Sequence, residues 1–437
     1  MKIGTAKRFT MPDRRSFLRG YGDRNSLSRG VEEPIEVGVM ALSGDDDRII
    51  LLIAADMVGI PEHECRKVYA RIAEKFGISA DRIWLCSTHT HFAPGFEGYF
   101  ITNRGGELAC GDHPDDAAYR ELWIGRALDA IDAAVKSMRE CHVEHVQFEA
   151  PGIMFNRRTI RKSDGMVEMS WEYPANEDDF IFQKCDPLMS AWKFVTGEGP
   201  AAILGCVGCH PVTGGRDGYL VSGDYPWYFR RKIEELYGCP GFFILGAAGD
   251  SVPGLRGPDS QKFSPKINSR KNIGEILALT LQQNEVRFRR DASQTAAMKV
   301  VEVPVSLPEE LDFENADRNY FEAEKNQSPD RDFHFRSREI AKFYTGRHFT
   351  MPLRLLRLGD KVLTGMPFEV LSAISLGLRE ANPDAVLVSI TGGFNGYMPL
   401  AGDFPVGGYE SSYGATHFPK GTGEKFLERA IEESLKF

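Results

Sequence analysis

The chain has 437 residues, enough to bury a large core, and 42% of them are hydrophobic, which is typical of a globular protein. Its 53 basic and 62 acidic residues give a formal net charge of −9, which disfavours binding to nucleic acids and anionic membranes. No apolar run is long enough for a signal peptide or a membrane span. Eight cysteines, most of them in apolar runs, complete the expectation of a reduced, cytoplasmic protein.

Short β-rich runs alternate with longer helical patterns, which predicts an α/β fold with a mixed β-sheet core flanked by helices. In chain order, the predicted strands are residues 48–57, 82–87, 143–150, 201–209, 241–249 and 385–393. The predicted helices are residues 62–77, 114–140, 226–238, 271–283, 368–381 and 421–436.

Two hairpins are also predicted, at residues 159–171 and 353–367, the first around the Asp164–Gly165 turn. The charged segment 307–347 is expected to be mostly helical. No internal repeat, linker or break in composition divides the chain, so we predict a single large domain over residues 1–437.

Two histidines close together follow a strand in the run "RIWLCSTHTHFAPG", residues 82–95. Side chains at positions i and i+2 of a strand point to the same face, so His89 and His91 can reach one point beyond the sheet. Pro94 ends the strand directly after them. The pair is compatible with a metal site and equally with polar side chains that terminate a strand.

A third histidine, His210, follows the apolar run "ILGCVGC" and precedes a proline. Catalytic zinc sites take three or four ligands from separate segments of the chain, so His210 is a candidate ligand. A histidine that is hydrogen-bonded within the protein is the alternative. Cys206 and Cys209 form a CxxC pair, but no second pair follows at zinc-ribbon spacing, and we interpret them as buried small side chains.

Two candidate oxygen ligands follow later strands. Glu369, in "LTGMPFEVLS", is expected in the first turn of a helix, where a capping carboxylate is the alternative. Tyr397 lies in the glycine-rich turn "ITGGFNGYMPL", where a surface aromatic residue is the alternative. A bound metal would lower the pKa of the tyrosine and make a phenolate ligand possible. Sites in α/β proteins collect at strand ends, where both residues are expected.

Two further segments carry charge at strand ends. "MFNRRTI" contains Arg157 and Arg158, either of which could orient an oxyanion or carboxylate, or remain solvated. "ILGAAGDSVPG" places Asp250 and Ser251 in a tight turn. This is not a GxSxG motif, and Pro253 follows too closely for the strand–serine–helix elbow of a serine hydrolase.

Taken together, these motifs resemble the N-terminal catalytic domain of the neutral/alkaline, non-lysosomal ceramidases and their shorter bacterial relatives. The resemblance is in the order and kind of the motifs and covers most of the chain. The motifs are "GYGDR", "AADMVGI", "STHTHFAPG", "FNRR", "CHPVTGG" followed by "SGDYP", "GAAGD", "MPFEV", and "NGY" with a later "YE". THTHxxPG is fairly specific, and the ordered set is more so.

In that family, a zinc ion bound by two histidines, a glutamate and a tyrosine activates water for amide hydrolysis. The resemblance implies the zinc ligands His89, His210, Glu369 and Tyr397. It also implies that the substrate carbonyl is held and polarised by His91, Arg157 and Tyr409. The group that passes a proton to the leaving amine stays open between His91 and Asp250.

The chain departs from the family at two places. Val252 stands where family members carry a serine, and Ser251 is shifted by one position, which disfavours a covalent serine mechanism. The chain ends soon after the "YE" motif, so we expect no C-terminal β-sandwich domain.

We predict a zinc-dependent amidohydrolase of a small-molecule N-acyl substrate, ceramide-like or smaller. The alternatives are an esterase, a non-catalytic or carbohydrate-binding relative with the same fold, and a serine hydrolase acting through Ser251.

Overall fold

The structure is a computed structural model of the chain. It describes residues 1–21, 24, 26–96, 114–150, 152–171, 173–174, 176–254, 270–306, 321–327, 338, 348–412, 415–416 and 418–437. The segment 307–347, predicted to be mostly helical, therefore lies largely outside the described residues.

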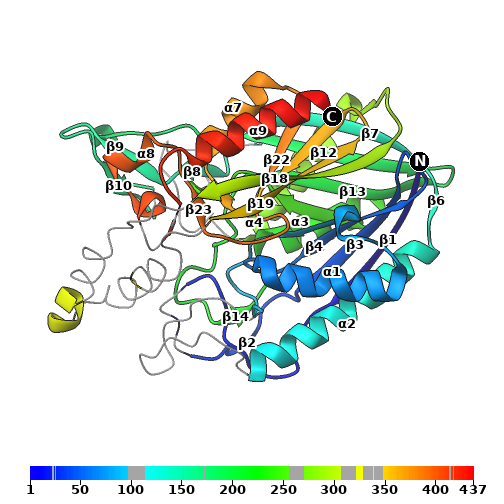
Figure 1. The fold of residues 1–437 in the computed structure, drawn as a ribbon, viewed down its shortest axis with the longest axis horizontal. Helices are drawn as coiled ribbons and strands as arrows, with labels where there is room; N and C mark the ends of the chain where they lie inside the picture. The colour runs from blue at the N-terminus through cyan, green and yellow to red at the C-terminus, as the bar shows by residue number, and fades with distance from the viewer. Residues whose placement is uncertain are drawn as a thin grey trace.

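The first main sheet has five strands in the order β5-β4-β3-β1-β6. Its strands are β1 (Lys2–Phe9), β3 (Glu36–Ser43), β4 (Ile49–Ala55), β5 (Ile83–Ser87) and β6 (Arg139–Glu140). Strands β4 and β5 are parallel, and the other pairs are antiparallel. Helices α1 (Glu62–Phe76) and α2 (Pro114–Lys136) cover its outer face (Figure 1). Helix α1 ends at Gly77, whose φ of 68° is the left-handed conformation expected at a helix C-terminus.

The second main sheet has the order β15-β13-β12-β7-β17. Its strands are β7 (His142–Glu149), β12 (Leu188–Thr196), β13 (Gly199–Val207), β15 (Gly241–Leu245) and β17 (Arg289–Arg290). Strands β13 and β15 are parallel because helix α3 (Asp224–Tyr237) connects them. Helix α4 (Arg270–Gln283) packs on α3, and both bury their apolar faces against this sheet.

The third main sheet has the order β18-β19-β20-β22. Its strands are β18 (Ala296–Ser306), β19 (His348–Leu358), β20 (Lys361–Gly365) and β22 (Ala385–Val388). Strands β20 and β22 are parallel and are joined through helix α7 (Ser372–Ala381). Helices α7 and α9 (Thr422–Lys436) cover its outer face.

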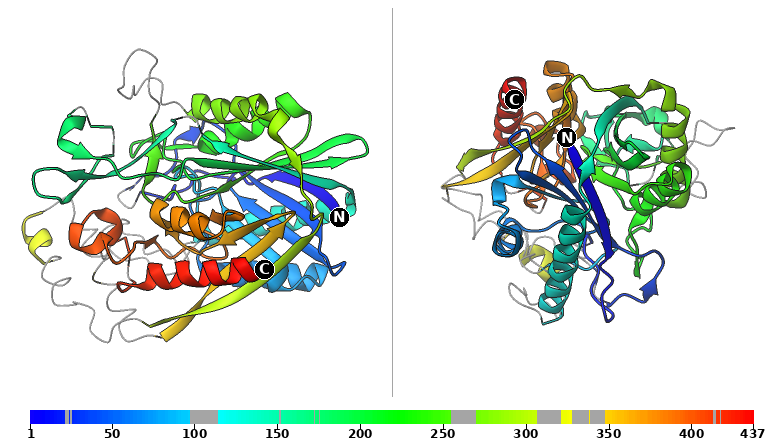
Figure 2. Two further views of the ribbon diagram at one scale, coloured as in Figure 1. Left: turned by 90° about the horizontal axis from the view of Figure 1, so that it is seen from above. Right: turned by 90° about the vertical axis from the view of Figure 1, so that its right-hand side faces the viewer.

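The inner faces of the three sheets meet in one shared core. Trp84 from the first sheet, Trp192 and Phe242 from the second, and Leu356 from the third belong to the same cluster and are buried. Burial of each large apolar side chain contributes about 1.5–3 kcal/mol. Figure 2 shows the helices on the outside of this arrangement of strands.

The parallel strand pairs of the three sheets are joined at their carboxyl ends. The Ser87 N–H, at the end of β5, donates to the Ile390 carbonyl beyond β22 at 3.2 Å. The Ser389 N–H donates to the Leu245 carbonyl at the end of β15 at 2.8 Å. Loops that follow strands of all three sheets are thereby brought to one place.

Short strand pairs form from the segments around this junction. They are β2 (Gly30–Val31) with β14 (Leu220–Val221), β8 (Met154–Asn156) with β16 (Ser251–Pro253), and β21 (Glu369–Val370) with β23 (Tyr397–Met398). A three-stranded ribbon joins β9 (Arg158–Arg161) to β10 (Val167–Met169) and β11 (Phe180–Ile181), and a one-turn helix α8 (Asp403–Val406) lies nearby (Figure 1).

The prediction of an α/β fold with a mixed β core and flanking helices is confirmed, and the core consists of three sheets. Both predicted hairpins form, as β9–β10 and β19–β20. The helix predicted over 368–381 begins only at Ser372, because residues 369–370 form strand β21. No helix in the described part of the chain has the length and apolarity needed to cross a membrane.

Candidate metal centre

The three histidines singled out in the sequence meet in one buried group, called here the histidine cluster: His89, His91 and His210. The Nε2 atom of His210 lies 2.9 Å from that of His89 and 3.0 Å from that of His91. The Nε2 atoms of His89 and His91 are 3.3 Å apart. Three ring nitrogens, carried by segments that follow strands of two different sheets, therefore converge on one point.

His89 and His91 reach this point by a different route from the one predicted. Strand β5 ends at Ser87, so strand alternation does not orient the two rings, and that explanation was wrong. His89 instead adopts a φ of 69°, a left-handed conformation that is uncommon for residues other than glycine. The His89 N–H donates to the Met57 carbonyl at 2.9 Å, and this tertiary contact supports the turn. Strained conformations of this kind cluster at functional sites.

The tautomers of two cluster histidines follow from their partners. His89 Nδ1 bonds to the Val58 carbonyl and His210 Nδ1 to the Ala248 carbonyl, the latter at 3.0 Å. A carbonyl can only accept, so each Nδ1 carries a proton, and when the ring is neutral its Nε2 atom presents a lone pair. Burial and the neighbouring His89 hold the pKa of His210 well below 6.5, which favours the neutral ring.

Two lone pairs that face each other at 2.9 Å repel unless a cation lies between them. Ligand nitrogens about 2.0–2.1 Å from a zinc ion are themselves about 3.3–3.4 Å apart in a tetrahedral site. The spacing in the histidine cluster is close to that value. Metal-binding histidines usually donate their other ring N–H to a carbonyl or carboxylate, as His89 and His210 do. The cluster could therefore hold a metal ion.

Glu369 adds a carboxylate to the same point. Its Oε2 atom lies 3.1 Å from His89 Nε2 and 3.7 Å from His210 Nε2, and its side chain is buried. Glu369 does not cap a helix, as one prediction held, because it lies in strand β21, before α7 begins. Strand β21 pairs in parallel with β23, which sets Glu369 beside Tyr397.

Tyr397 completes the predicted ligand set at a short distance from Glu369. Its hydroxyl accepts a hydrogen bond from Arg157 Nη2 at 3.0 Å. Burial, followed by the adjacent Glu369 carboxylate, raises the pKa of Tyr397 well above 10, and the Arg157 guanidinium partly opposes this shift. Without a further cation, the phenol stays protonated, so only a bound metal ion would make it a phenolate ligand.

His91 differs from the other two cluster histidines. Its Nδ1 atom is buried without a hydrogen-bond partner in the described residues. Burial, and then His89, lowers its pKa well below 6.5. Its ring packs edge-on against Tyr21, with centroids 4.9 Å apart. Gly20, at φ 113°, leaves room for this ring, since a Cβ atom there would lie 2.3 Å from it.

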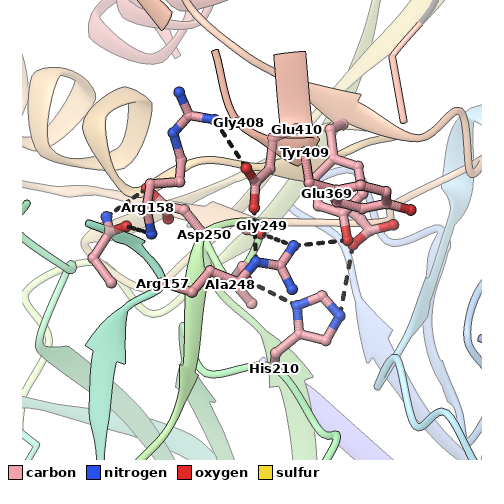
Figure 3. A network of polar contacts seen from close by, with 12 residues as sticks. Arg157, Arg158, His210, Ala248, Gly249, Asp250, Glu369, Gly408, Tyr409 and Glu410 are labelled. Carbon is pink, nitrogen blue, oxygen red and sulfur yellow. Dashed lines mark hydrogen bonds and ion pairs between the residues drawn. The ribbon is translucent and has the colours of Figure 1, made fainter. Parts of the chain in front are cut away.

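Arg157 joins a second buried group, the arginine–glutamate cluster of Arg157, Arg158 and Glu410 (Figure 3). Arg157 Nε donates to Glu410 Oε1 at 2.7 Å, and Arg158 Nη1 donates to Glu410 Oε2 at 2.9 Å. Burial opposes the charge on Arg157, but Tyr397 and Glu410 raise the pKa of its guanidinium, which stays cationic. Glu410 thus holds one arginine beside Tyr397.

Arg158 holds the segment that carries Glu410 and Tyr409. Its Nη2 atom donates to the Gly407 carbonyl at 2.9 Å and lies 3.3 Å from the Asp403 carboxylate. Gly408, at φ 99°, is required beside this guanidinium, because a Cβ atom there would lie 2.6 Å from Nη1. The consecutive arginines of the "NRR" motif therefore have two roles: Arg157 faces the candidate site and Arg158 anchors its rim.

Glu410 was not among the predicted site residues. The only sequence signal was its place in the "YE" motif, where Tyr409 was selected. Tyr409 packs its ring 5.4 Å from Tyr397, centroid to centroid, and 5.8 Å from the exposed Trp171. These rings form a wall that extends from the candidate metal ligands to the surface.

Asp250 and Ser251 lie beside the site with their side chains directed elsewhere. Asp250 Oδ1 accepts hydrogen bonds from the backbone and hydroxyl of Ser372, and Oδ2 accepts one from Asn156. Ser251 is fully buried, and its hydroxyl makes no hydrogen bond to a histidine within the described residues. The neighbouring backbone does contribute to the site, because the Ala248 carbonyl accepts from His210 and the Gly249 carbonyl from Arg157.

Comparisons with known proteins bear on the fold. No protein-family model and no curated protein matches the sequence. Among solved structures, the neutral ceramidase from Pseudomonas aeruginosa matches with a TM-score of 0.74 and 15% identity, over 99% of this chain and 74% of that chain. The chain has the neutral ceramidase fold.

A second solved structure, a ceramidase complexed with C2, matches with a TM-score of 0.70 and 15% identity, over the same 99% and 74% of the two chains. At this identity, the similarity establishes the fold, and an activity has to be argued from the residues of the site.

Proposed function

We propose that the protein is a zinc-dependent hydrolase that cleaves the C–N amide bond of an N-acyl substrate. The observation that carries this proposal is the pair of facing Nε2 atoms of His89 and His210, 2.9 Å apart beside the Glu369 carboxylate. The neutral ceramidase fold supports the assignment to amide hydrolysis.

The proposed zinc ligands are His89, His210, Glu369 and Tyr397. Two imidazole nitrogens with a carboxylate oxygen are a donor set that suits zinc. The carbonyls of Val58 and Ala248 fix the ring orientation of the two histidines. When bound, zinc supplies Lewis acidity and lowers the pKa of a coordinated water molecule toward 7.

His91 and Arg157 are proposed to bind the substrate carbonyl and the oxyanion that develops from it. Unlike the two ligand histidines, His91 has no acceptor for Nδ1 in the described residues, so its proton is free to sit on Nε2 and to be donated there. Arg157 uses Nε and Nη2 for Glu410, Gly249 and Tyr397, which leaves its Nη1 hydrogens for a substrate oxygen. Tyr409 lines the same wall.

We assign the transfer of a proton to the leaving amine to His91. The alternative from the sequence, Asp250, holds its carboxylate against Ser372 and Asn156. A carboxylate engaged by three donors is a poor proton carrier.

The proposed substrate is a small-molecule N-acyl amide, ceramide-like or smaller. The predicted cytoplasmic location and the single-domain organisation over residues 1–437 stay predictions.

Hydrolysis of a matched panel tests the proposal. It should contain N-acyl amides of increasing chain length, ceramide, and the corresponding esters. Release of free amine is expected, with activity lost on chelation and restored by zinc. Reaction with a fluorophosphonate probe, or turnover that is unchanged after chelation, would contradict the proposal. Zinc binding without turnover of any amide or ester would favour the non-catalytic alternative.

A further inference from the structure

A cavity of about 700 Å³ lies at the opposite end of the third sheet from the histidine cluster. Lys361 begins strand β20 at this cavity, and Asp384 lies directly before β22. Glu369 follows the other end of β20. The facing wall comes from the second sheet, through His145 of β7 and Arg289 of β17. The cavity is therefore a cleft between the ends of two sheets.

The carboxylates that line this cleft are already engaged. The Asp360 carboxylate accepts hydrogen bonds from the backbone N–H groups of Ala292 and Ser293, both at 2.7 Å. Asp291 accepts the Asp360 N–H at 3.0 Å. Asp384 forms an ion pair with Lys361 at 2.6 Å. None of the three is paired with an arginine in the described part of the chain.

The cleft is lined by four cations, which are three arginines and Lys361, and by three carboxylates, so its formal charge, four minus three, is +1. Arg287, Arg289 and Arg357 have no carboxylate within ion-pair distance in the described residues. Arg287 and Arg289 donate to oxygens of neutral groups, and the Arg357 guanidinium lies 5.0 Å from the ring centroid of Phe437. Neutral partners orient a guanidinium but do not cancel its charge.

The buried side of the cleft offers one unsatisfied polar atom. His145 is 7% exposed, packs on Trp192 at 5.0 Å between centroids, and has no hydrogen-bond partner for Nε2 in the described residues. Burial, assisted by Lys361, lowers its pKa to about 3, so the ring is neutral. It supplies hydrogen-bonding capacity without adding charge.

Another surface cavity, of about 530 Å³, offers a comparison in which most of the cations are paired with carboxylates. There Lys7 pairs with Glu36 and Glu234 at 3.2 and 2.8 Å. Arg231 pairs with the same two carboxylates at 3.1 and 2.7 Å. Arg8 also lines that cavity and donates to the Lys7 carbonyl, with no carboxylate partner in the described residues. One of its three cations is therefore without a carboxylate partner, against three of the four cations in the arginine-lined cleft.

We propose that the arginine-lined cleft binds a small molecule that carries phosphate groups. The planar guanidinium fork matches the oxygens of phosphate, and three such forks around one cleft provide multidentate recognition. The volume is in the range of small-molecule sites. This site is independent of the proposed hydrolase activity and lies at the opposite end of the strands that lead to Glu369.

Calorimetric titration of the full chain with inorganic pyrophosphate at low ionic strength tests the proposal. Saturable binding at one site is expected, and it should weaken as salt screens the arginines. Arg289→Ala and Arg357→Ala should each weaken binding about 10-fold or more. Arg126→Ala is the matched control, because Arg126 is an exposed arginine on α2 without an ion pair in the described residues, and it should leave the affinity unchanged.

Pyrophosphate also binds zinc, so the same titration on His89→Ala separates the two sites. Unchanged affinity in this variant, together with unchanged zinc content in the arginine variants, supports the cleft. No binding to the wild-type chain would overturn the proposal, as would an affinity that the arginine variants do not alter or a loss of binding in His89→Ala.

Discussion

The histidine cluster and the arginine–glutamate cluster are adjacent, and both are buried, but they differ in how their polar groups are satisfied. In the arginine–glutamate cluster, each Glu410 carboxylate oxygen accepts a hydrogen bond from an arginine, and both arginines also donate to backbone carbonyls. In the histidine cluster, the Nε2 atoms of His89 and His210 face each other at 2.9 Å, and each presents a lone pair when its ring is neutral. A buried polar group without a partner costs free energy. The charges of the first cluster are paired within the protein, with Arg158 Nε as the one donor left without a partner in the described residues, whereas the second cluster requires a ligand.

The difference separates scaffold from site. Arg157 belongs to both regions, because Glu410 fixes it from one side while its Nη2 atom contacts the Tyr397 hydroxyl on the other. We infer that the charged cluster keeps the proposed substrate-binding arginine in place, and that the neutral cluster provides the chemistry. Each prediction alters one of the two regions and leaves the other intact.

The largest effect is expected from loss of a proposed metal ligand. His89→Ala and His210→Ala should each remove the bound zinc and lower kcat/KM about 1,000-fold or more, because the metal supplies several kcal/mol of transition-state stabilisation. Metal content and turnover should be measured on the same samples. His63→Ala, at an exposed histidine on α1, is the control and should change neither. Retention of zinc by both ligand variants would disprove the assignment.

Breaking the charged cluster should reduce stability. Glu410→Gln removes the anion of the buried Arg157 and one of the two carboxylates that face Arg158, and the free energy of unfolding should fall by about 3–5 kcal/mol in urea titrations. The exposed Glu428→Gln is the control, and its unfolding free energy should stay within about 0.5 kcal/mol of wild type. A change of similar size in both variants would mean that Glu410 is not an essential partner of the arginines.

Arg157→Lys tests how the two clusters are coupled. Lysine keeps the charge but cannot reach Glu410, Gly249 and Tyr397 at once, so kcat should fall about 100-fold with zinc content unchanged. A variant with normal kcat and a raised KM would place Arg157 in ground-state binding only.

The zinc-free protein should lose stability as the pH falls. His91 and His210 have folded pKa values well below 6.5, so the unfolded chain binds more protons below that pH. Each of the two should cost up to about 1.4 kcal/mol per pH unit below about 6.5. Urea unfolding of chelator-treated protein between pH 7.5 and about 5 measures the slope, and His210→Gln should reduce it. A flat profile would mean that the rings are protonated in the folded state.

The smallest effect is expected at Ser251. Its hydroxyl is buried and not hydrogen-bonded to a histidine, so Ser251→Ala should change kcat/KM by less than about twofold. Loss of activity in this variant would revive the serine-hydrolase alternative.

The parallel strands and the residues that follow them were predictable, because buried strands are continuous apolar runs and polar residues directly after them are conspicuous. The antiparallel strands β1 and β3 were not assigned, and β1 is largely polar and partly exposed. The left-handed turn at His89 depends on a hydrogen bond to the Met57 carbonyl, which no local pattern reveals. Glu410 has its role because the fold brings it into contact with Arg157 and Arg158. These arginines are more than 250 residues away in the chain, so the contact exists only in the folded protein.

The most direct test of the central claim is an anomalous diffraction measurement at the zinc edge on crystals of protein purified without chelator. We predict one strong peak between His89 Nε2, His210 Nε2 and Glu369 Oε2, at about 2.0–2.2 Å from each. An absent peak in zinc-soaked crystals whose histidines still converge on one point would contradict the account.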